Sequence, residues 1–150
     1  MEKQDAVRNE ISLLVASQLL AVLATQQGGQ PYTSLLAFAA GNDLADIFLA
    51  TDRATRKYKN ILEDNRVALL IDNRSNQSAD FGAAAAATII GRAGEMEGRT
   101  LEAARTIFLA RHPSLEDFVM APGTALLKVA VSRYVMVTRF EEVHVLDMGG

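Results

Sequence analysis

Hydroxyl and cationic side chains gather where an apolar segment, residues 47–51, gives way to a polar one. Thr51 ends the apolar segment, and Thr55, Arg56 and Lys57 follow after a three-residue turn. This order predicts a strand that turns into a helix near Thr55. Helix N-termini carry unpaired N–H groups and a partial positive charge, so they attract phosphate, and the two cations strengthen that attraction. A phosphorylated ligand is one hypothesis, and a solvated basic turn that begins an ordinary amphipathic helix is the other.

The composition indicates a packed soluble protein. The chain has 150 residues, of which 49% are apolar and 22% charged, and this suits one domain, residues 1–150, with a real core. The absence of Cys excludes disulfides, thiolate nucleophiles and zinc–thiolate sites. The net charge of −3 argues against nucleic-acid binding. No apolar run reaches membrane-spanning length and the first residues are too polar for a secretory signal, so we expect a cytoplasmic location and no membrane partner.

Apolar periodicity predicts the elements of the first half of the chain. Val7, Ile11 and Leu14 recur at helical spacing. Gly28 and Gly29 separate two short apolar runs and predict a hairpin turn. We expect a helix over about 4–17, strands over 19–25, 31–38 and 47–51, a helix from 55 to about 64, a fully buried strand over 67–71 and a surface loop over 72–82.

The second half begins with a conflict of propensities. Residues 83–87 are all alanine, which prefers helix, yet they lead into residues 88–91, which favour strand. We interpret the segment as one long strand to about Met96, and a short alanine helix is the alternative. A helix should follow, ending near Pro113. Closing strands are expected over 124–130, 134–140 and 143–146. This order predicts a mostly β protein with flanking helices, built as a closed or partly open, largely antiparallel barrel.

Three segments together carry the pattern of a known family. Residues 47–51 form a strand ending in Thr, and Thr55-Arg56-Lys57 supplies a Ser/Thr-Arg-Lys triplet. Residues 65–70, Asn-Arg-Val-Ala-Leu-Leu, match an Asn-(Pro)-Arg-Val-x-Leu strand, and residues 88–93 resemble the strand that follows it. In these features the chain resembles the FMN-binding split barrel family, typified by pyridoxamine 5′-phosphate oxidase. The resemblance covers about residues 19–140 in element order and implies a split β-barrel.

The resemblance implies a cofactor, its binding residues and a partner. FMN would lie between the two subunits of a homodimer, beside a small-molecule substrate. Arg56 and Lys57 would clamp the FMN phosphate, and Thr51 and Thr55 would offer hydroxyl donors to the same group. The isoalloxazine ring would be lined, partly through backbone N–H groups, by Thr33, Ser34, Leu35, Leu49 and Ala50.

The chain departs from the oxidases at positions that matter for their cofactor and their substrate. Ser34 and Ala39 stand where those enzymes have an Arg and a Lys that contact FMN, and Ala86 stands near the position of their Gln. Their carboxy-terminal Trp and Arg have no counterpart in this chain. The phosphate clamp is retained and the oxidase substrate apparatus is not, so pyridoxamine phosphate is not the expected substrate.

No side chain stands out as a general acid, a general base or a metal ligand. His112 precedes Pro113 at a helix end, where a cationic or capping role is expected, and His144 alternates with valines in a terminal strand that faces solvent or a dimer contact. Two isolated histidines make a poor metal site, although either could ligate haem.

We therefore expect an FMN-dependent oxidoreductase that acts on a small molecule, with unassigned catalytic residues. In such a site the flavin carries the redox chemistry and the protein supplies binding and orientation. Two alternatives stay open: a non-catalytic flavin- or haem-binding module, and a deazaflavin-dependent reductase on the same fold.

Overall fold

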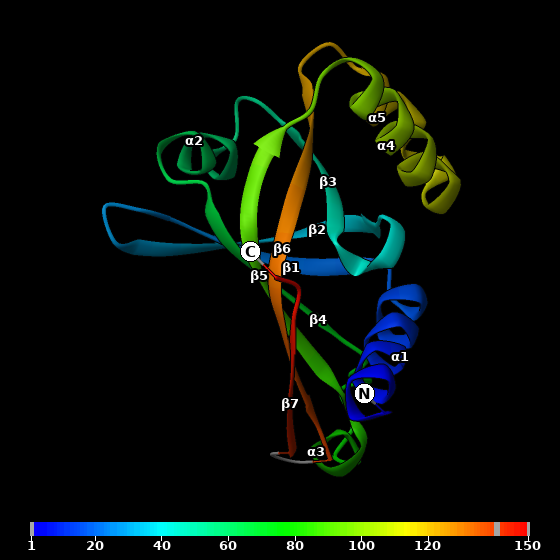
Figure 1. Ribbon diagram of the computed structural model, residues 1–150. Helices are drawn as coiled ribbons and strands as arrows, with labels where there is room; N and C mark the ends of the chain where they lie inside the picture. The colour runs from blue at the N-terminus through cyan, green and yellow to red at the C-terminus, as the bar shows by residue number, and fades with distance from the viewer. Residues whose placement is uncertain (1, 140–141, 150) are drawn as a thin grey trace.

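The computed structural model describes residues 2–139 and 142–149 and contains a six-stranded antiparallel β-barrel flanked by helices (Figure 1). This confirms the predicted fold class. The elements are α1 (Glu2–Ser17), β1 (Leu20–Gln27), β2 (Gln30–Ala40), the 3₁₀ turn η1 (Asn42–Leu44), β3 (Asp46–Asp52), α2 (Arg56–Glu63), β4 (Arg66–Asp72), α3 (Asp80–Ala83), β5 (Ala86–Glu95), α4 (Gly98–Arg111), the 3₁₀ turn η2 (Pro113–Leu115), α5 (Glu116–Met120), β6 (Thr124–Thr138) and β7 (Glu142–Asp147).

The barrel closes through its longest strand. The strands follow one another in the order β3-β2-β1-β4-β5-β6, and an additional pairing of β3 with β6 closes the ring. β6 pairs with β5 on one side along most of its length. On its other side, residues 124–130 pair with β3 and residues 133–138 pair with β7. β7 is therefore attached outside the closed ring.

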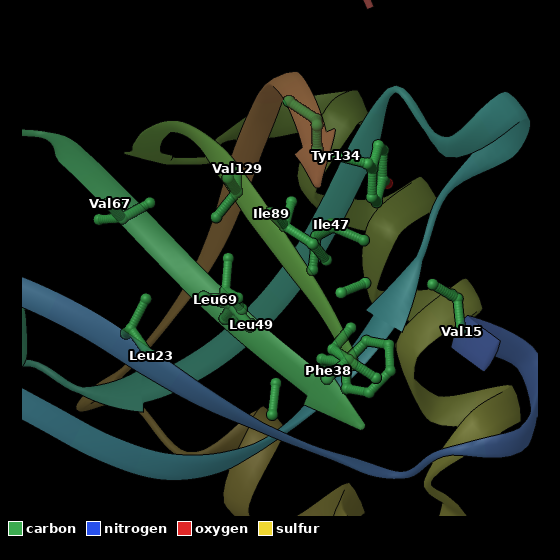
Figure 2. Close-up of a cluster of buried hydrophobic side chains, with 14 of the residues drawn as sticks. Val15, Leu23, Phe38, Ile47, Leu49, Val67, Leu69, Ile89, Val129 and Tyr134 are labelled. Atoms are coloured by element: carbon green, nitrogen blue, oxygen red, sulfur yellow. The ribbon is translucent and has the colours of Figure 1, made fainter. Parts of the chain in front are cut away.

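Alternate side chains of each strand fill the barrel. The expectation of a fully buried strand over residues 67–71 is wrong, because Val67, Leu69 and Ile71 point inward while Leu70 is 37% exposed. Period-two alternation is the rule for a strand with one solvated face, and the apolar outward residues concealed it in the sequence. Figure 2 shows one inward residue from each barrel strand: Leu23, Phe38, Leu49, Leu69, Ile89 and Val129.

Helices cover the barrel at separate places. α1 packs Ile11, Leu14 and Val15 against the core, as its periodicity predicts. α4 and α5 cover a second apolar cluster on the outside of the barrel, where Phe108 meets Phe48 and neighbouring apolar residues of β3 and β6. α2 lies beside the projecting β1–β2 hairpin, on the other side of the barrel from α1 and α4 (Figure 1). No helix within residues 2–139 and 142–149 has the length and hydropathy to cross a membrane.

Two expected strand boundaries need correction. The long strand over residues 83–96 is shorter, because α3 occupies its start and β5 begins at Ala86. The Asp80 carboxylate accepts the backbone N–H groups of residues 75–77, which fixes the turn that leads into α3. The two strands expected over 124–130 and 134–140 form one strand, β6, which ends at Thr138; Phe140 lies outside the described residues. A register shift at Ile90/Gly91 leaves Ser132 without a residue opposite it, and its hydroxyl donates to the Ile90 carbonyl at 3.0 Å.

Candidate functional site

The strand-to-helix junction lies where the sequence predicts it, and Thr55 is the N-cap of α2. Its Oγ1 accepts the Tyr58 N–H at 3.4 Å and donates to the Asp52 carbonyl at 2.7 Å. Thr51 is 2% exposed, and its Oγ1 lies 3.0 Å from that of Thr55. Both hydroxyls therefore bond within the junction, and their main contribution is to fix where the helix begins.

Two cations stand at the start of this helix without acidic partners. Arg56 is exposed, and its Nη1 donates to the Gln27 side chain at 2.7 Å. Lys57 is half-buried. Neither forms an ion pair with any described residue, and their backbone N–H groups have no acceptor among these residues. The nearby Asp52 carboxylate accepts the Ala54 N–H at 2.7 Å and so has its own partner. The start of α2 is thus a positively charged surface with unused donors.

The third cation of the junction has a structural role. Arg53 forms an ion pair of 2.5 Å with Glu95 and donates to the Pro122 carbonyl at 2.9 Å. Tyr58 donates its O–H to the same carboxylate at 2.5 Å. The hydrogen bond from Arg53 holds the pKa of Glu95 below its usual value, and the bond to Glu95 raises the pKa of Tyr58. This cluster ties the first turn of α2 to the end of β5. Sequence reasoning missed it because Glu95 lies 42 residues from Arg53.

The barrel is split between β2 and β3, next to this junction. The β2–β3 ladder has three residue pairs, from Ala40↔Ile47 to Phe38↔Leu49, and the rest of β2 is paired with β1 only. Thr33, Ser34 and Leu35 lie on the part of β2 that has no β3 partner, and Ala50 and Thr51 lie on the part of β3 that has no β2 partner. The structure therefore places these five residues along one gap in the strand pairing, which we call the opening. The side chain of Leu49 is fully buried in the barrel core (Figure 2), and that of Ala50 is buried in the second apolar cluster.

Backbone N–H groups of β2 point into the split. Phe38 donates its N–H toward β1, to the Leu19 carbonyl at 3.3 Å. In an antiparallel strand the N–H groups of alternate residues point to opposite sides, so those of Thr33 and Leu35 point away from β1. They have no backbone acceptor outside the strand ladders among the described residues. These donors could bond a flat ring that entered the opening.

The departures from the oxidase pattern fall in different environments. Ser34 is half-buried on β2, opposite Leu23. Ala39 is 2% exposed and packs in the apolar cluster beneath α4. Ala86 is half-buried at the first residue of β5. A long cation at position 39 would have to displace that packing, which gives a physical reason for the small residue there.

A mostly apolar row, interrupted by Thr88, crosses the outside of the barrel next to the split. Leu35 is opposite Val22, Val22 is opposite Leu70, and the row continues across β5, β6 and β7 through Thr88, Val135 and Val145. Leu35 is 68% exposed and Val145 40% exposed. Exposed apolar patches of this continuity mark interaction surfaces. The row escaped sequence analysis because it is assembled from six strands.

The histidines have separate surroundings. His112 is buried at the C-terminus of α4, and its Nε2 lies 2.6 Å from the Phe38 carbonyl oxygen, which β1 does not reach. The backbone N–H of His112 caps α4 by donating to the Phe108 carbonyl at 2.9 Å, but the side chain bonds to β2 and does not cap the helix as expected. His144 is half-buried on β7, with its Nε2 3.3 Å from Glu142. Across the described part of the chain, no three His, Asp or Glu side chains gather in a way that could hold a metal ion.

Solved structures of other proteins share this fold. A haem-binding protein from Mycobacterium smegmatis matches with a TM-score of 0.84 and 21% identity, over 93% of this chain and 57% of that one. General stress protein 26 from Bacillus anthracis matches with a TM-score of 0.72 and 20% identity, over 95% and 98%. An FAD-binding protein from Mesorhizobium loti matches with a TM-score of 0.71 and 16% identity, over 85% and 90%.

The first of these structures is much longer than this chain, which spans 57% of its length. No curated protein sequence gives a significant match. The sequence profile of the family described as pyridoxamine 5′-phosphate oxidase matches residues 7–138, which include every strand of the barrel. The chain therefore belongs to the pyridoxamine 5′-phosphate oxidase-like split-barrel family.

Proposed function

We propose that this protein is a homodimeric, FMN-dependent oxidoreductase that acts on a small molecule other than pyridoxamine phosphate. The observation that carries the proposal is the pair of cations at the start of α2, which have no acidic partner and lie beside the open edge of β2. A ligand that carries both a phosphate and a flat ring would bind the cations with its phosphate and the open edge of β2 with its ring. When bound, FMN supplies hydride and electron transfer.

The residues present fit the phosphate of FMN. The backbone N–H groups of Arg56 and Lys57 and their side chains are the available donors. The hydroxyls of Thr51 and Thr55 are hydrogen-bonded to each other, and that of Thr55 also donates to the Asp52 carbonyl. We therefore propose that they hold the start of α2 in place, while Arg56 and Lys57 make the principal contacts with the phosphate. The N–H groups of the β2 edge would orient the ring, because Ser34 supplies no charged side chain to contact FMN as the oxidase Arg does.

A second copy of the chain would complete this site. The mostly apolar row on the barrel surface begins at Leu35, at the edge of the split. Leu35, Leu70 and Val145 are exposed in a single chain, and the other three residues are half-buried. Stable dimers bury about 800 Å² on each partner, and a face crossing six strands can supply such an area. A dimer formed there would place the partner's residues over the opening and exclude water from the ring.

Haem binding is the second candidate. His144 lines a cavity of about 540 Å³ between α1 and the β6–β7 hairpin, and the similar Mycobacterium smegmatis structure is a haem-binding protein. A deazaflavin would use Arg56 and Lys57 as FMN does. The absorption spectrum of the purified protein and the mass of the released ligand separate these candidates.

The clamp is tested by titration with FMN and with riboflavin, which lacks the phosphate. Arg56→Ala/Lys57→Ala should weaken FMN binding about 100-fold or more, because each charge-assisted hydrogen bond contributes about 1.5–3 kcal/mol. Riboflavin binding should not change. Lys3→Ala/Arg99→Ala is the matched control, since it removes two exposed positive charges from α1 and α4.

Three results would contradict the proposal. Equal FMN affinity in Arg56→Ala/Lys57→Ala and in the control would show that the phosphate does not bind at the start of α2. A flavin-loaded monomer in sedimentation experiments would exclude a cofactor shared between subunits. A protein that is colourless and does not bind added FMN would exclude the flavin function altogether.

A further inference from the structure

We propose that a second ligand site lies between α1 and α4, and that it binds an organic anion with an apolar body. This site is independent of the proposed FMN site. It lies on the side of the barrel that carries α1 and α4, whereas α2 and the β1–β2 hairpin lie on the other side (Figure 1).

The site is a cavity of about 630 Å³ with a mostly apolar wall. Cavities that bind small ligands have volumes of about 300–1,000 Å³. Ala39 and Ala40 of β2 contribute small side chains, Val15 contributes from α1, and Ile107 and Ala110 contribute from α4. Because Ala39, Ala40 and Ala110 have short side chains, the space between the two helices is not filled by the protein itself.

Two arginines from different helices line this cavity. Arg8 of α1 donates one N–H, from Nη1, to the Asp43 carbonyl at 3.1 Å. Arg111 of α4 uses its Nη2 on the carbonyls of Val15 and Gln18, at the end of α1. The other N–H groups of both guanidinium groups have no partner among the described residues. Each arginine is thus held in place by part of its donor set and keeps the rest for a ligand.

The charge balance of the cavity favours an anion. Both arginines are half-buried, and neither forms an ion pair with a described acid. Asp43 is the single acidic residue among those that line the cavity, and its carboxylate lies beyond ion-pair distance of both. Partly buried cations without a counter-charge are costly, so a carboxylate, sulfonate or phosphate on the ligand would lower the free energy of the site.

The wall opposite the helices is held in a strained conformation. Asp43 and Leu44 have φ angles of 59° and 63°, in the left-handed region that side chains rarely adopt. Arg8 holds the carbonyl of Asp43, and Tyr134 donates its O–H to the carbonyl of Leu44 at 2.7 Å. Strained backbone of this kind is maintained where the surroundings over-determine it, often at ligand sites. Arg8 therefore holds the strained turn at Asp43 and, with its remaining N–H groups, would also contact the anion.

The test uses two fluorescent probes of similar shape, the anion 1-anilinonaphthalene-8-sulfonate and neutral N-phenyl-1-naphthylamine. The wild-type protein should bind one anionic probe per chain at this site. Arg8→Gln and Arg111→Gln should each weaken the anionic probe about tenfold or more and leave the neutral probe unchanged. Arg99→Gln is the charge control, because Arg99 is exposed on α4 and does not line the cavity.

A cavity-filling variant keeps the test decisive if either arginine variant folds poorly. Ala110 is exposed and lines the cavity, so Ala110→Phe should fill it and abolish binding of both probes. Ala103→Phe adds the same bulk to an exposed position of α4 that does not line the cavity.

Three results would overturn the proposal. The wild-type protein could fail to bind the anionic probe, or the affinities of Ala110→Phe and Ala103→Phe could be equal. If Ala110→Phe weakened probe binding and neither arginine variant did, the cavity would bind apolar ligands only, and the proposal that it binds an anion would be wrong.

Discussion

Gly91 is the glycine at which an added methyl group should do most damage. A Cβ at this position would lie 2.3 Å from the Ala130 carbonyl oxygen and 2.9 Å from Val129 Cγ1. The carbonyl belongs to β6, which is paired with β5 on one side and β3 on the other, so it cannot move without disturbing two ladders. Overpacking typically costs 1–3 kcal/mol, and a clash with fixed backbone belongs at the upper end. We expect Gly91→Ala to lower the free energy of unfolding by about 3 kcal/mol.

Gly94→Ala is the matched control for this prediction. It lies in the same strand, and a Cβ there would meet nothing within 4 Å. Both substitutions reduce the freedom of the unfolded chain equally, so the difference between them isolates the clash. We expect Gly94→Ala to stay within about 0.5 kcal/mol of wild type.

Urea unfolding, followed by circular dichroism, measures both variants. Gly91→Ala should shift the midpoint without a change in m-value, and its Tm should fall by about 6–12 °C for a chain of this size. Equal stability of the two variants would refute the reasoning. It would show that β6 shifts at the bulge near Ser132 to make room for the added methyl group, at little cost in stability.

Two further predictions concern buried and titrating groups. His112→Leu should destabilise the protein by about 1–3 kcal/mol, because it leaves the Phe38 carbonyl without its hydrogen-bond partner. His144→Leu is the control and should have a smaller effect. Equal losses of stability in thermal unfolding would contradict this prediction. The pKa of Glu95 is lowered by Arg53, so its stabilisation is present above the usual value of 4.5 and is lost as the pH falls through the lowered folded value. Glu95→Gln should therefore flatten the decline of the urea midpoint below about pH 4.5, and an unchanged slope would count against the ion pair.

Local signals in the sequence predicted the start of the candidate site well. Thr55 is an N-cap because its side chain and the following N–H groups are close in the chain, and this is the kind of contact that a sequence pattern records. The strand before it and the helix after it were predicted for the same reason. Binding of FMN by the nine residues named at the outset stays a prediction.

Contacts between distant segments could not be predicted in this way. Nothing near Arg53 in the sequence indicates that Glu95 reaches it from another strand. The inward and outward faces of β4 could not be told apart, because Leu70 on the outside is as apolar as Leu69 on the inside. The position of His112 at a helix end was predicted from the sequence. Its partner, the carbonyl of Phe38, belongs to β2 and could not be predicted. In each case the deciding partner lies on another strand or helix.

The two-sided pairing of β6 has a consequence for the order of folding. Asp52 pairs with Thr124 and Asp46 with Ala130, so the contacts that close the barrel join residues 72 to 84 positions apart. Such distant contacts form late, because the loop-closure entropy must be lost before they stabilise the chain. During synthesis the free edge of β3 remains unpaired until residues 124–130 have been made, and that of β5 until residues 127–137 have been made. Unpaired edges are sites of association between chains. The yield of soluble protein should therefore depend on how fast the first half of β6 docks.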